Sequence, residues 1–494
     1  MASVSRVASR ILVPFLVVLG ALLWLVLGAV AWAMQPPTTE QLATYLDDGS
    51  LAARAAEARS YGNHLMRPEL LERARFKAEN LSRQNQGLAP LDPEVYTPPA
   101  AWRGMPTTGT VKVLAVCIAF ADKAPVTPVE TIRSKLYGAG TGSGFPYESL
   151  SAYYERASYG KLHIEGEVLG WYTTSYARSA VVQSWAGREN LIKEVIGSYD
   201  TQGHDFSQYD NNGDGEIDYF LVFWTGEHGD WATFWWGMQI SGWSTGAPMA
   251  DGKRFGGYSW QWELYNWPSG SYTPLVAIHE TGHALGLPDY YDYDGNAGPD
   301  GGLGGLDMMD ANKGDHNAFS KFVLDWLTPA VLSRGRRAVS LAPSGEQPEA
   351  LILFPQADGQ PFGEYFLVQN RWRVQNDTPL PTDGLVVWHV DARTDGWNYL
   401  FDNSYAEHKL LRLMEADGLE EIEAGGGADA GDYYRPGSRF GPDTAPASTD
   451  YAGAASDVWA SDISLDPATK AITFRAGVGS GVFSTAALSL LLGE

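Results

Sequence analysis

The segment from His279 to Asp289, which reads HETGHALGLPD, constrains this chain more than any other part of the sequence. A helix places residues four positions apart on one face, so the imidazoles of His279 and His283 can bind one ion together. Glu280 would lie beside the ion without binding it, placed to take a proton from a zinc-bound water. A chain of 494 residues with 9 His and 59 acidic residues is expected to match this spacing only about 0.02 times by chance. The pattern predicts the catalytic zinc site of a metallopeptidase, the alternative being an ordinary helix with two surface histidines.

The residues on either side of the motif predict a buried helix and a third zinc ligand. Thr273 and Pro274 are typical of a helix start, with the threonine as N-cap, and the apolar residues that follow indicate burial. Gly286 offers a left-handed stop that turns the chain back toward the metal. Asp289 is then the predicted third ligand. The alternative is an arrangement in which a more distant Glu or Asp binds the zinc.

The motif resembles the metzincin form of the zinc signature, HExxHxxGxxD, with Asp where many members have His. The continuation, LPDYYDYD and then GLGGLDMMDANKGDHNAFSKFVLDWLTP, is similar to the immune inhibitor A-like secreted metallopeptidases of bacteria. The resemblance extends over residues 110–477 and is strongest over residues 279–329. It implies a methionine turn under the zinc, supplied by Met308 or Met309. Plain core packing of these methionines is a compatible alternative.

The N-terminus predicts export from the cytoplasm. Arg6 and Arg10 precede an uncharged run, whose apolar part, Ile11–Met34, is longer than the usual core of a signal peptide. This part is long enough to span a bilayer, yet residues 31–33 (AWA) are typical of a signal-peptide cleavage site. Two interpretations stay open: a cleaved signal peptide, or an uncleaved anchor with its positive end inside. Both place the rest of the chain outside the cytoplasm, where the single cysteine, Cys117, cannot form an intramolecular disulfide.

The acidic balance of the chain points to cations as ligands. The net charge of -24 argues against nucleic acid or an anionic membrane surface as partner, although simple solvation explains most of it. Residues 210–218, DNNGDGEID, match the first nine positions of an EF-hand-type loop, but position twelve is Leu221. We therefore expect a shorter structural calcium loop, or a turn without an ion. The predicted ligands are Asp210, Asn212, Asp214, Asp218 and, through its backbone carbonyl, Glu216. A looser acidic cluster leaves calcium and a solvated loop equally open: Asp292, Asp294 and Asp300.

Composition and periodicity divide the chain into five parts. Residues 1–34 are the signal peptide or anchor, and residues 478–494 form a short apolar tail. Residues 35–106 are polar, helix-prone and end in a Pro-rich linker, which predicts a helical propeptide that blocks the cleft until removed. A permanent N-terminal arm is the alternative. Residues 107–335 predict an α/β (α+β), metzincin-like zinc peptidase domain, and the short strand-like runs of residues 336–477 predict an all-β sandwich.

The predicted function is that of an exported zinc-dependent endopeptidase. We expect a monomer that acts on proteins or peptides, with no nucleic-acid partner and with membrane contact only through an uncleaved N-terminus. Glu280 would accept a proton from zinc-activated water and deliver it to the leaving amine. His316 is a candidate oxyanion donor, with a tyrosine or a backbone amide as alternatives. The rival is a non-enzymatic exported binding protein that contacts protein or glycan through a Trp-rich surface, drawn from the tryptophans of residues 229–267.

Overall fold

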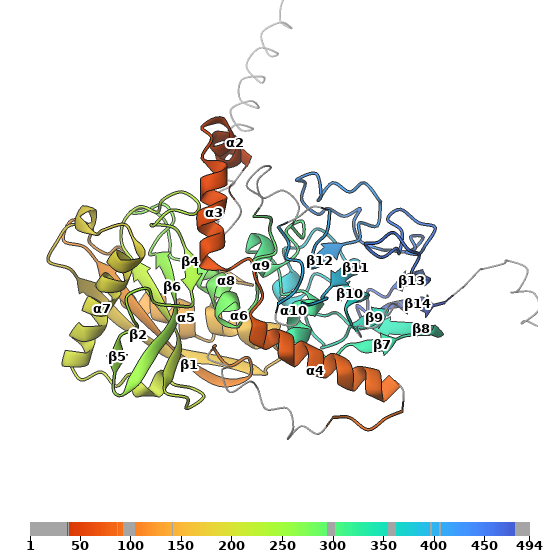
Figure 1. Ribbon diagram of the computed structural model, residues 1–494, viewed down its shortest axis with the longest axis horizontal. Coiled ribbons are helices and arrows are strands. Elements are labelled where there is room, and N and C mark those ends of the chain that lie inside the picture. The colour runs from red at the N-terminus through yellow and green to blue at the C-terminus, as the bar shows by residue number, and fades with distance from the viewer. Residues whose placement is uncertain are drawn as a thin grey trace, which may run out of the picture. The chain divides into compact units, whose positions relative to one another are not determined.

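The computed structural model describes residues 37–479, except for 38, 86, 92–103, 141, 294–301, 354–361, 396–397 and 405–406. The predicted signal segment, most of the Pro-rich linker, nearly all of the apolar tail, Asp294 and Asp300 lie outside the described residues. The helices within the described ranges include none that is both long and apolar enough to cross a membrane. Helices and three open sheets confirm the predicted mixed α and β class (Figure 1).

A six-stranded sheet carries the first half of the fold. It consists of β1 (Gly109–Ala119), β2 (Leu162–Thr173), β3 (Glu216–Trp224), β4 (Met238–Ile240), β5 (Met249–Ala250) and β6 (Lys253–Trp262). The strand order is β2-β1-β3-β6-β4, with β5 paired to β6; the first four strands run parallel, and β4 and β5 run antiparallel to β6. Val113 and Leu114 of β1 belong to two different hydrophobic cores. Because successive side chains of a strand point to opposite faces, the sheet is buried on both faces, as its long apolar runs predict.

Helices cover both faces of this sheet. One core contains residues of α5 (Val129–Tyr137), α6 (Leu150–Ala157) and α8 (Leu275–Ala284), while the other contains residues of α7 (Trp185–Thr201). Serines start two of these helices: the Ser149 side chain accepts a hydrogen bond from Ala152 N, and the Ser184 side chain accepts one from Gly187 N. Two short 3-10 helices, η1 (Arg178–Ala180) and η2 (Ser207–Tyr209), lie in the connections.

Two further sheets form the C-terminal region. The five-stranded sheet has the order β12-β11-β10-β9-β7, and the three-stranded sheet has the order β13-β14-β8. Their strands are β7 (Ala330–Leu332), β8 (Gly335–Leu341), β9 (Leu351–Leu353), β10 (Glu364–Arg371), β11 (Gly384–Asp391), β12 (Leu411–Leu413), β13 (Val458–Leu465) and β14 (Ile472–Val478), with the 3-10 helix η3 (Gln375–Asp377) between β10 and β11. Phe366 and Val368 of β10 share a core with the three-stranded sheet, whereas Tyr365 and Leu367 belong to the core that contains α8. The five-stranded sheet therefore packs against both the smaller sheet and the helical layer.

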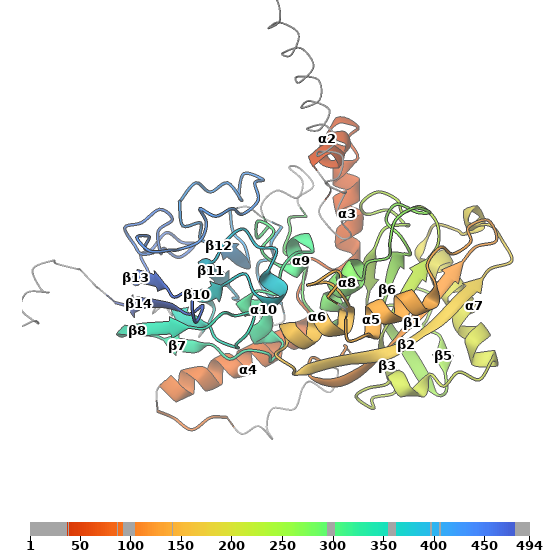
Figure 2. The same cartoon turned by 180° about the vertical axis from the view of Figure 1, so that it is seen from behind.

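The N-terminal helical segment, residues 39–91, consists of α2 (Thr39–Asp47), α3 (Leu51–Tyr61), α4 (Pro68–Asn85) and a short extension. Figure 2 shows α3 and α4 as two separate arms that meet near α8. Helix α4 contacts α10 (Ala318–Val323), and its Arg73 forms an ion pair of 2.7 Å with Asp325. Lys77 of α4 pairs with the same carboxylate.

The tryptophans of residues 229–267 pack inside the molecule. Five of them are at most 8 % exposed: Trp231, Trp235, Trp236, Trp260 and Trp262. Their rings contact one another, with 5.5 Å between the centroids of Trp235 and Trp260 and 5.3 Å between those of Trp236 and Trp262. Most of this aromatic cluster therefore fills the core behind the sheet and is not available as a contact surface.

Candidate metal centre

Helix α8 presents the histidines of the HExxH motif from inside the protein. All ten of its residues are buried. The helix starts after Pro274, which occupies the N-cap position without a side-chain hydrogen bond, so the predicted Thr273 cap is wrong by one residue. At the other end Gly286 has φ +101°, and Leu287 N donates to Gly282 O at 3.0 Å. This left-handed turn is the predicted stop, and it sends the chain back along the helix.

Three side chains from α8 and the turn after it converge on one point. The Nε2 atoms of His279 and His283 lie 3.2 Å apart, and Asp289 Oδ1 lies 2.9 Å from the first and 3.4 Å from the second. All three residues are at most 2 % exposed, and their ligand atoms form a group that could hold a metal ion. The structure therefore brings Asp289, the ligand that helical geometry alone does not place, beside both histidines.

The partners of the two imidazoles orient them for metal binding. His279 Nδ1 donates to Met308 O at 2.9 Å, and His283 Nδ1 donates to Leu287 O at 2.8 Å. With Nδ1 protonated, each Nε2 carries a lone pair directed at the other ring and at Asp289 Oδ1. Three lone-pair atoms facing one another in a buried space repel unless a cation lies between them. Two nitrogens and one carboxylate oxygen suit zinc, which binds three protein ligands in catalytic sites and keeps a fourth position open.

The electrostatics of the group also favour a positive charge. Burial lowers the pKa of His279, but its hydrogen bond with Asp289 and the charge of that carboxylate outweigh burial and raise the pKa to about 9. Burial raises the pKa of Asp289, but the two histidines hold it well below its usual range. Without a metal, the site therefore retains a proton that a bound cation would replace.

Glu280 is a buried carboxyl group without a hydrogen-bond partner. It is fully buried, and neither of its carboxylate oxygens accepts a hydrogen bond within the described part of the chain. Burial raises its pKa to about 8, against the opposing effect of His279. A carboxyl group with a pKa near neutrality can both take and return a proton, which is the property of a general base.

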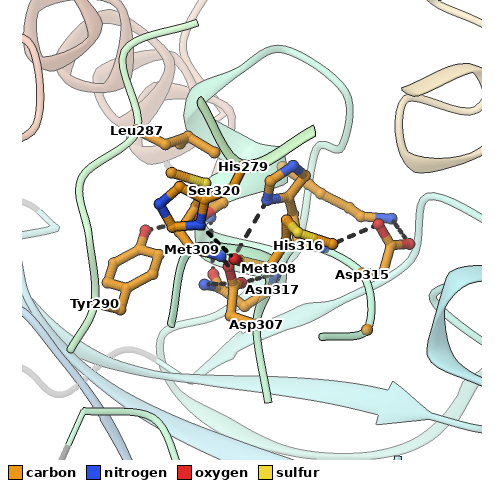
Figure 3. A network of polar contacts seen from close by, with 12 residues as sticks. His279, Leu287, Tyr290, Asp307, Met308, Met309, Asp315, His316, Asn317 and Ser320 are labelled. Atoms are coloured by element: carbon orange, nitrogen blue, oxygen red, sulfur yellow. Dashed lines mark hydrogen bonds and ion pairs between the residues drawn. The ribbon is translucent and has the colours of Figure 1, made fainter. Parts of the chain in front are cut away.

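A short helix beneath α8 uses both candidate methionines. In α9 (Met308–Ala311), Met308 supplies the carbonyl that orients His279 (Figure 3). The Sδ atom of Met309 lies against Gly282. Asp307 caps this helix by accepting a hydrogen bond from Met309 N at 2.7 Å. The turn is thus both a packing element and a support for His279, the first of the predicted zinc ligands.

The close contact at Gly282 makes a specific prediction about stability. A Cβ atom added there would lie 2.2 Å from Met309 Sδ, so Gly282→Ala should destabilise the protein by about 1–3 kcal/mol in urea unfolding. Gly197 in α7 is the matched control, because a Cβ there meets nothing within 4 Å. Gly197→Ala should instead stabilise by up to about 1 kcal/mol through helix propensity. Equal effects of the two substitutions would contradict the packing described for Met309.

The structure does not bring His316 into the metal group. Its ring is fully buried and packs at a tilt against Tyr154 and Trp326, with centroid distances of 5.8 Å to each. Its Nδ1 lies 3.7 Å from Asp307 Oδ1, and Figure 3 shows both residues beside Met308. These contacts favour a packing role, and the oxyanion role of His316 stays a prediction.

The predicted ligands of the calcium loop have partners from the protein itself. Asp210 pairs with Lys253 at 2.7 Å, and Glu216 pairs with Arg254 at 2.5 Å. The other predicted ligands accept hydrogen bonds from amides of the loop itself: Asn212, Asp214 and Asp218. Within the described residues these carboxylates do not come within reach of one common ion. Calcium at residues 210–218 stays a prediction, and lysine and arginine supply positive charge to Asp210 and Glu216.

The N-terminal helical segment lies directly against the metal-site loop. Asn63 O accepts a hydrogen bond of 2.7 Å from the backbone N of Asp289, and Arg67 N donates to Gly286 O at 3.1 Å. Leu70 packs on the same turn, since a Cβ added at Gly286 would lie 2.7 Å from its Cδ1. The connection between α3 and α4 therefore contacts the backbone of the third ligand. The sequence predicts a covering segment, but no local pattern identifies these residues.

Sequence reasoning missed residues that support the ligands. The hydroxyl of Tyr293 donates to Asp289 Oδ2, and the hydroxyl of Tyr154 donates to Ile278 O at 2.6 Å. Tyr293 follows Asp289 by four residues in LPDYYDYD, so the tyrosine-rich run after the ligand was an available signal.

A scan against protein-family models and a search of the curated proteins found no match to this chain. The family resemblance therefore rests on the motif residues and stays a prediction.

Proposed function

We propose that this protein is an exported, metzincin-like zinc endopeptidase of the immune inhibitor A-like type, made in a latent form. The observation that carries the proposal is the buried convergence of His279, His283 and Asp289 beside the unpartnered carboxyl group of Glu280. Structural zinc sites use four protein ligands, whereas this group offers three and a neighbouring base, as a hydrolytic site requires. The basic and apolar N-terminus supports export, as a secreted or a membrane-anchored protein.

The residues of the site would divide the chemistry of peptide hydrolysis between them. When bound, zinc lowers the pKa of water from 15.7 toward ~7 and polarises the scissile carbonyl. His279, His283 and Asp289 would hold the metal, with Met308 O and Tyr293 fixing their orientation. Glu280 would accept the proton of the attacking water at one carboxylate oxygen and deliver it to the nitrogen of the leaving amine. Both transfers need a carboxylate oxygen that is not already engaged, and neither oxygen of Glu280 accepts a hydrogen bond in the described residues.

The edge of the six-stranded sheet supports a peptide as substrate. Strand β4 runs antiparallel at the end of the strand order and contacts α8. An edge strand can bind an extended peptide through backbone hydrogen bonds, which would lay the scissile bond along the zinc helix. Helix α3 of the N-terminal helical segment also contacts β4. The segment thus covers both the metal-site loop and the proposed peptide-binding edge, which supports latency.

The non-enzymatic alternative has less support. It depends on a Trp-rich surface, yet five tryptophans of that region are buried. It also gives no account of Glu280, because burying a carboxyl group without a hydrogen bond is unfavourable and a binding module gains nothing from it.

The proposed function predicts that cleavage of the linker releases activity. A protease site inserted within residues 92–103 would allow the folded full-length protein to be cut after purification. We expect the intact protein to hydrolyse casein slowly or not at all, and the cut protein to hydrolyse it in a reaction that a zinc chelator stops. The same cut protein carrying Glu280→Gln is the control for contaminating peptidases.

The outcomes separate the two parts of the proposal. Equal hydrolysis before and after the cut would rule out latency and leave the peptidase assignment in place. Casein hydrolysis that survives chelation, or none under any condition, would contradict the zinc peptidase itself.

A further inference from the structure

The irregular segment between β12 and β13, far along the chain from the zinc motif, is rich in acidic residues. Two of its glutamates are neutralised by cations: Glu423 lies 2.5 Å from Lys409 Nζ and 3.3 Å from Arg412 Nε, and Glu420 pairs with the same arginine. Five other acidic residues of the segment form no ion pair within the described part of the chain: Glu415, Asp417, Glu421, Asp429 and Asp432. We call these five residues the acidic group. Within the described residues, no lysine, arginine or histidine side chain neutralises them.

Three carboxylates of the acidic group lie close together. Glu415, Asp417 and Glu421 each offer one oxygen, and these oxygens lie within 4.8 Å of one another. Asp417 also reaches the other arm of the loop, since a Cβ added at Gly431 would lie 2.2 Å from Asp417 Oδ2 and 3.0 Å from Asp429 Oδ1. Asp417 thus lies where the two acidic arms of the segment, 415–421 and 429–432, meet.

Asp432 supplies an independent sign that a ligand is missing. It is fully buried, and its Oδ1 has no hydrogen-bond partner in the described residues, while Oδ2 accepts only from Asp429 N at 2.6 Å. Its backbone joins the two acidic arms, since Ala416 N donates to Asp432 O at 3.2 Å. A buried carboxylate among like charges is unfavourable unless a cation compensates it.

We propose that the acidic group forms a calcium site, separate from the zinc site and from the loop of residues 210–218. Its donors are all carboxylate oxygens, which suit a hard cation, whereas zinc prefers nitrogen and sulfur ligands. Glu415 and Asp432 are buried, while Asp417 and Asp429 are exposed, so water can complete the coordination from the open side. Calcium accepts six to eight oxygens in flexible geometry, whereas magnesium requires a near-ideal octahedron.

The position of the site gives the ion a structural role. The ligands flank residues 422–428, and within that stretch Ala428 N donates to Gly304 O at 2.8 Å. Ile422 packs on the same glycine, because a Cβ added at Gly304 would lie 2.7 Å from its Cδ1. Gly304 precedes Met308, the residue that orients His279, by four positions. An ion that joins the two acidic arms would therefore hold residues 422–428 against the segment that leads into the methionine turn.

Terbium luminescence tests the site directly in the zinc-loaded, full-length protein. Tb3+ occupies calcium sites and emits when a nearby tyrosine absorbs, and Tyr433 and Tyr434 directly follow Asp432 in the chain. We expect Asp417→Asn/Glu421→Gln to weaken Tb3+ binding by about tenfold or more, because two ligands lose their charge. Asp200→Asn in α7 is the matched control, because Asp200 is also exposed but belongs to no predicted metal site, and it should leave this signal unchanged. Unchanged Tb3+ affinity in the double variant would overturn the proposal.

Two further readouts identify the ion and its effect. Ca2+ should displace Tb3+ at lower concentration than Mg2+, and the reverse order would contradict the calcium assignment. Ca2+ should raise the unfolding temperature of the wild type and of Asp200→Asn by more than that of the double variant, since binding stabilises the folded state only through an intact site. An equal shift in all three proteins would show that the acidic group is not the site. Neither readout measures peptide hydrolysis, so failure here leaves the proposed function untouched.

Discussion

Glu280→Gln should lower casein hydrolysis by the processed protein by about 10²–10⁴-fold and leave zinc binding unchanged. The amide has the shape of the carboxyl group but cannot accept the proton of the attacking water. Folding should not suffer, because neither oxygen of Glu280 accepts a hydrogen bond in the described residues and the substitution removes a buried ionisable group. The measurements are the initial rate on casein and the zinc content of the same preparation.

Glu280→Asp provides the graded control for this result. It keeps a proton acceptor but withdraws it by one methylene, so its rate should fall between those of the wild type and Glu280→Gln. A wild-type rate in Glu280→Gln would mean that another group moves the proton. Loss of zinc from Glu280→Gln would mean that Glu280 belongs to the ligand set.

Asp289→Asn should weaken zinc binding by more than about 100-fold, and with it the hydrolytic activity. Asp289 is the only charged ligand of the three, and its Oδ1 lies within 3.4 Å of both histidine Nε2 atoms. Replacing the carboxylate by a neutral amide removes the charge that attracts the cation. Zinc affinity can be measured by competition with a chelator of known strength, with unfolding monitored to verify that the variant is folded.

Tyr293→Phe separates ligand loss from loss of ligand support. It removes the hydrogen bond to Asp289 Oδ2 and the 3.0 Å hydrogen bond with the Tyr291 hydroxyl, but it leaves the Asp289 carboxylate in place. We therefore expect zinc affinity to fall by only about tenfold, the smaller effect seen when a hydrogen-bond partner of a metal ligand is lost. If Asp289→Asn bound zinc like the wild type, the third ligand would be a more distant acidic residue. The two variants together therefore test Asp289, the predicted ligand whose position helical geometry does not determine.

The zinc motif shows how far local sequence can predict a site. The four-residue spacing of His279 and His283 and the left-handed turn at Gly286 are properties of the local backbone, and both are present as predicted. Asp289 could be predicted because that turn leaves only a short chain to the metal. The contacts that orient the ligands, from Met308 and Tyr293, needed the folded chain because nothing in the motif defines them.

The predicted calcium loop shows what a local pattern leaves undetermined. Residues 210–218 have the spacing of a calcium loop, but Lys253 and Arg254 pair with Asp210 and Glu216 from a neighbouring strand. A sequence motif carries no information about which distant cation will reach it. The acidic group, by contrast, could not be predicted from sequence spacing. Glu415 and Asp432 are seventeen positions apart without any regular spacing, and only the fold of the loop brings them near each other. The contacts of Asn63 and Arg67 with the metal-site loop are long-range in the same way.

Titration of the metal-stripped, linker-cut protein with zinc tests the central claim most directly. The account predicts that casein hydrolysis rises in proportion to added zinc and reaches a plateau at one equivalent. Cut Glu280→Gln should bind the same single equivalent and remain inactive. Activity that is full before zinc is added, or that does not follow zinc occupancy, would contradict a catalytic centre built from His279, His283 and Asp289.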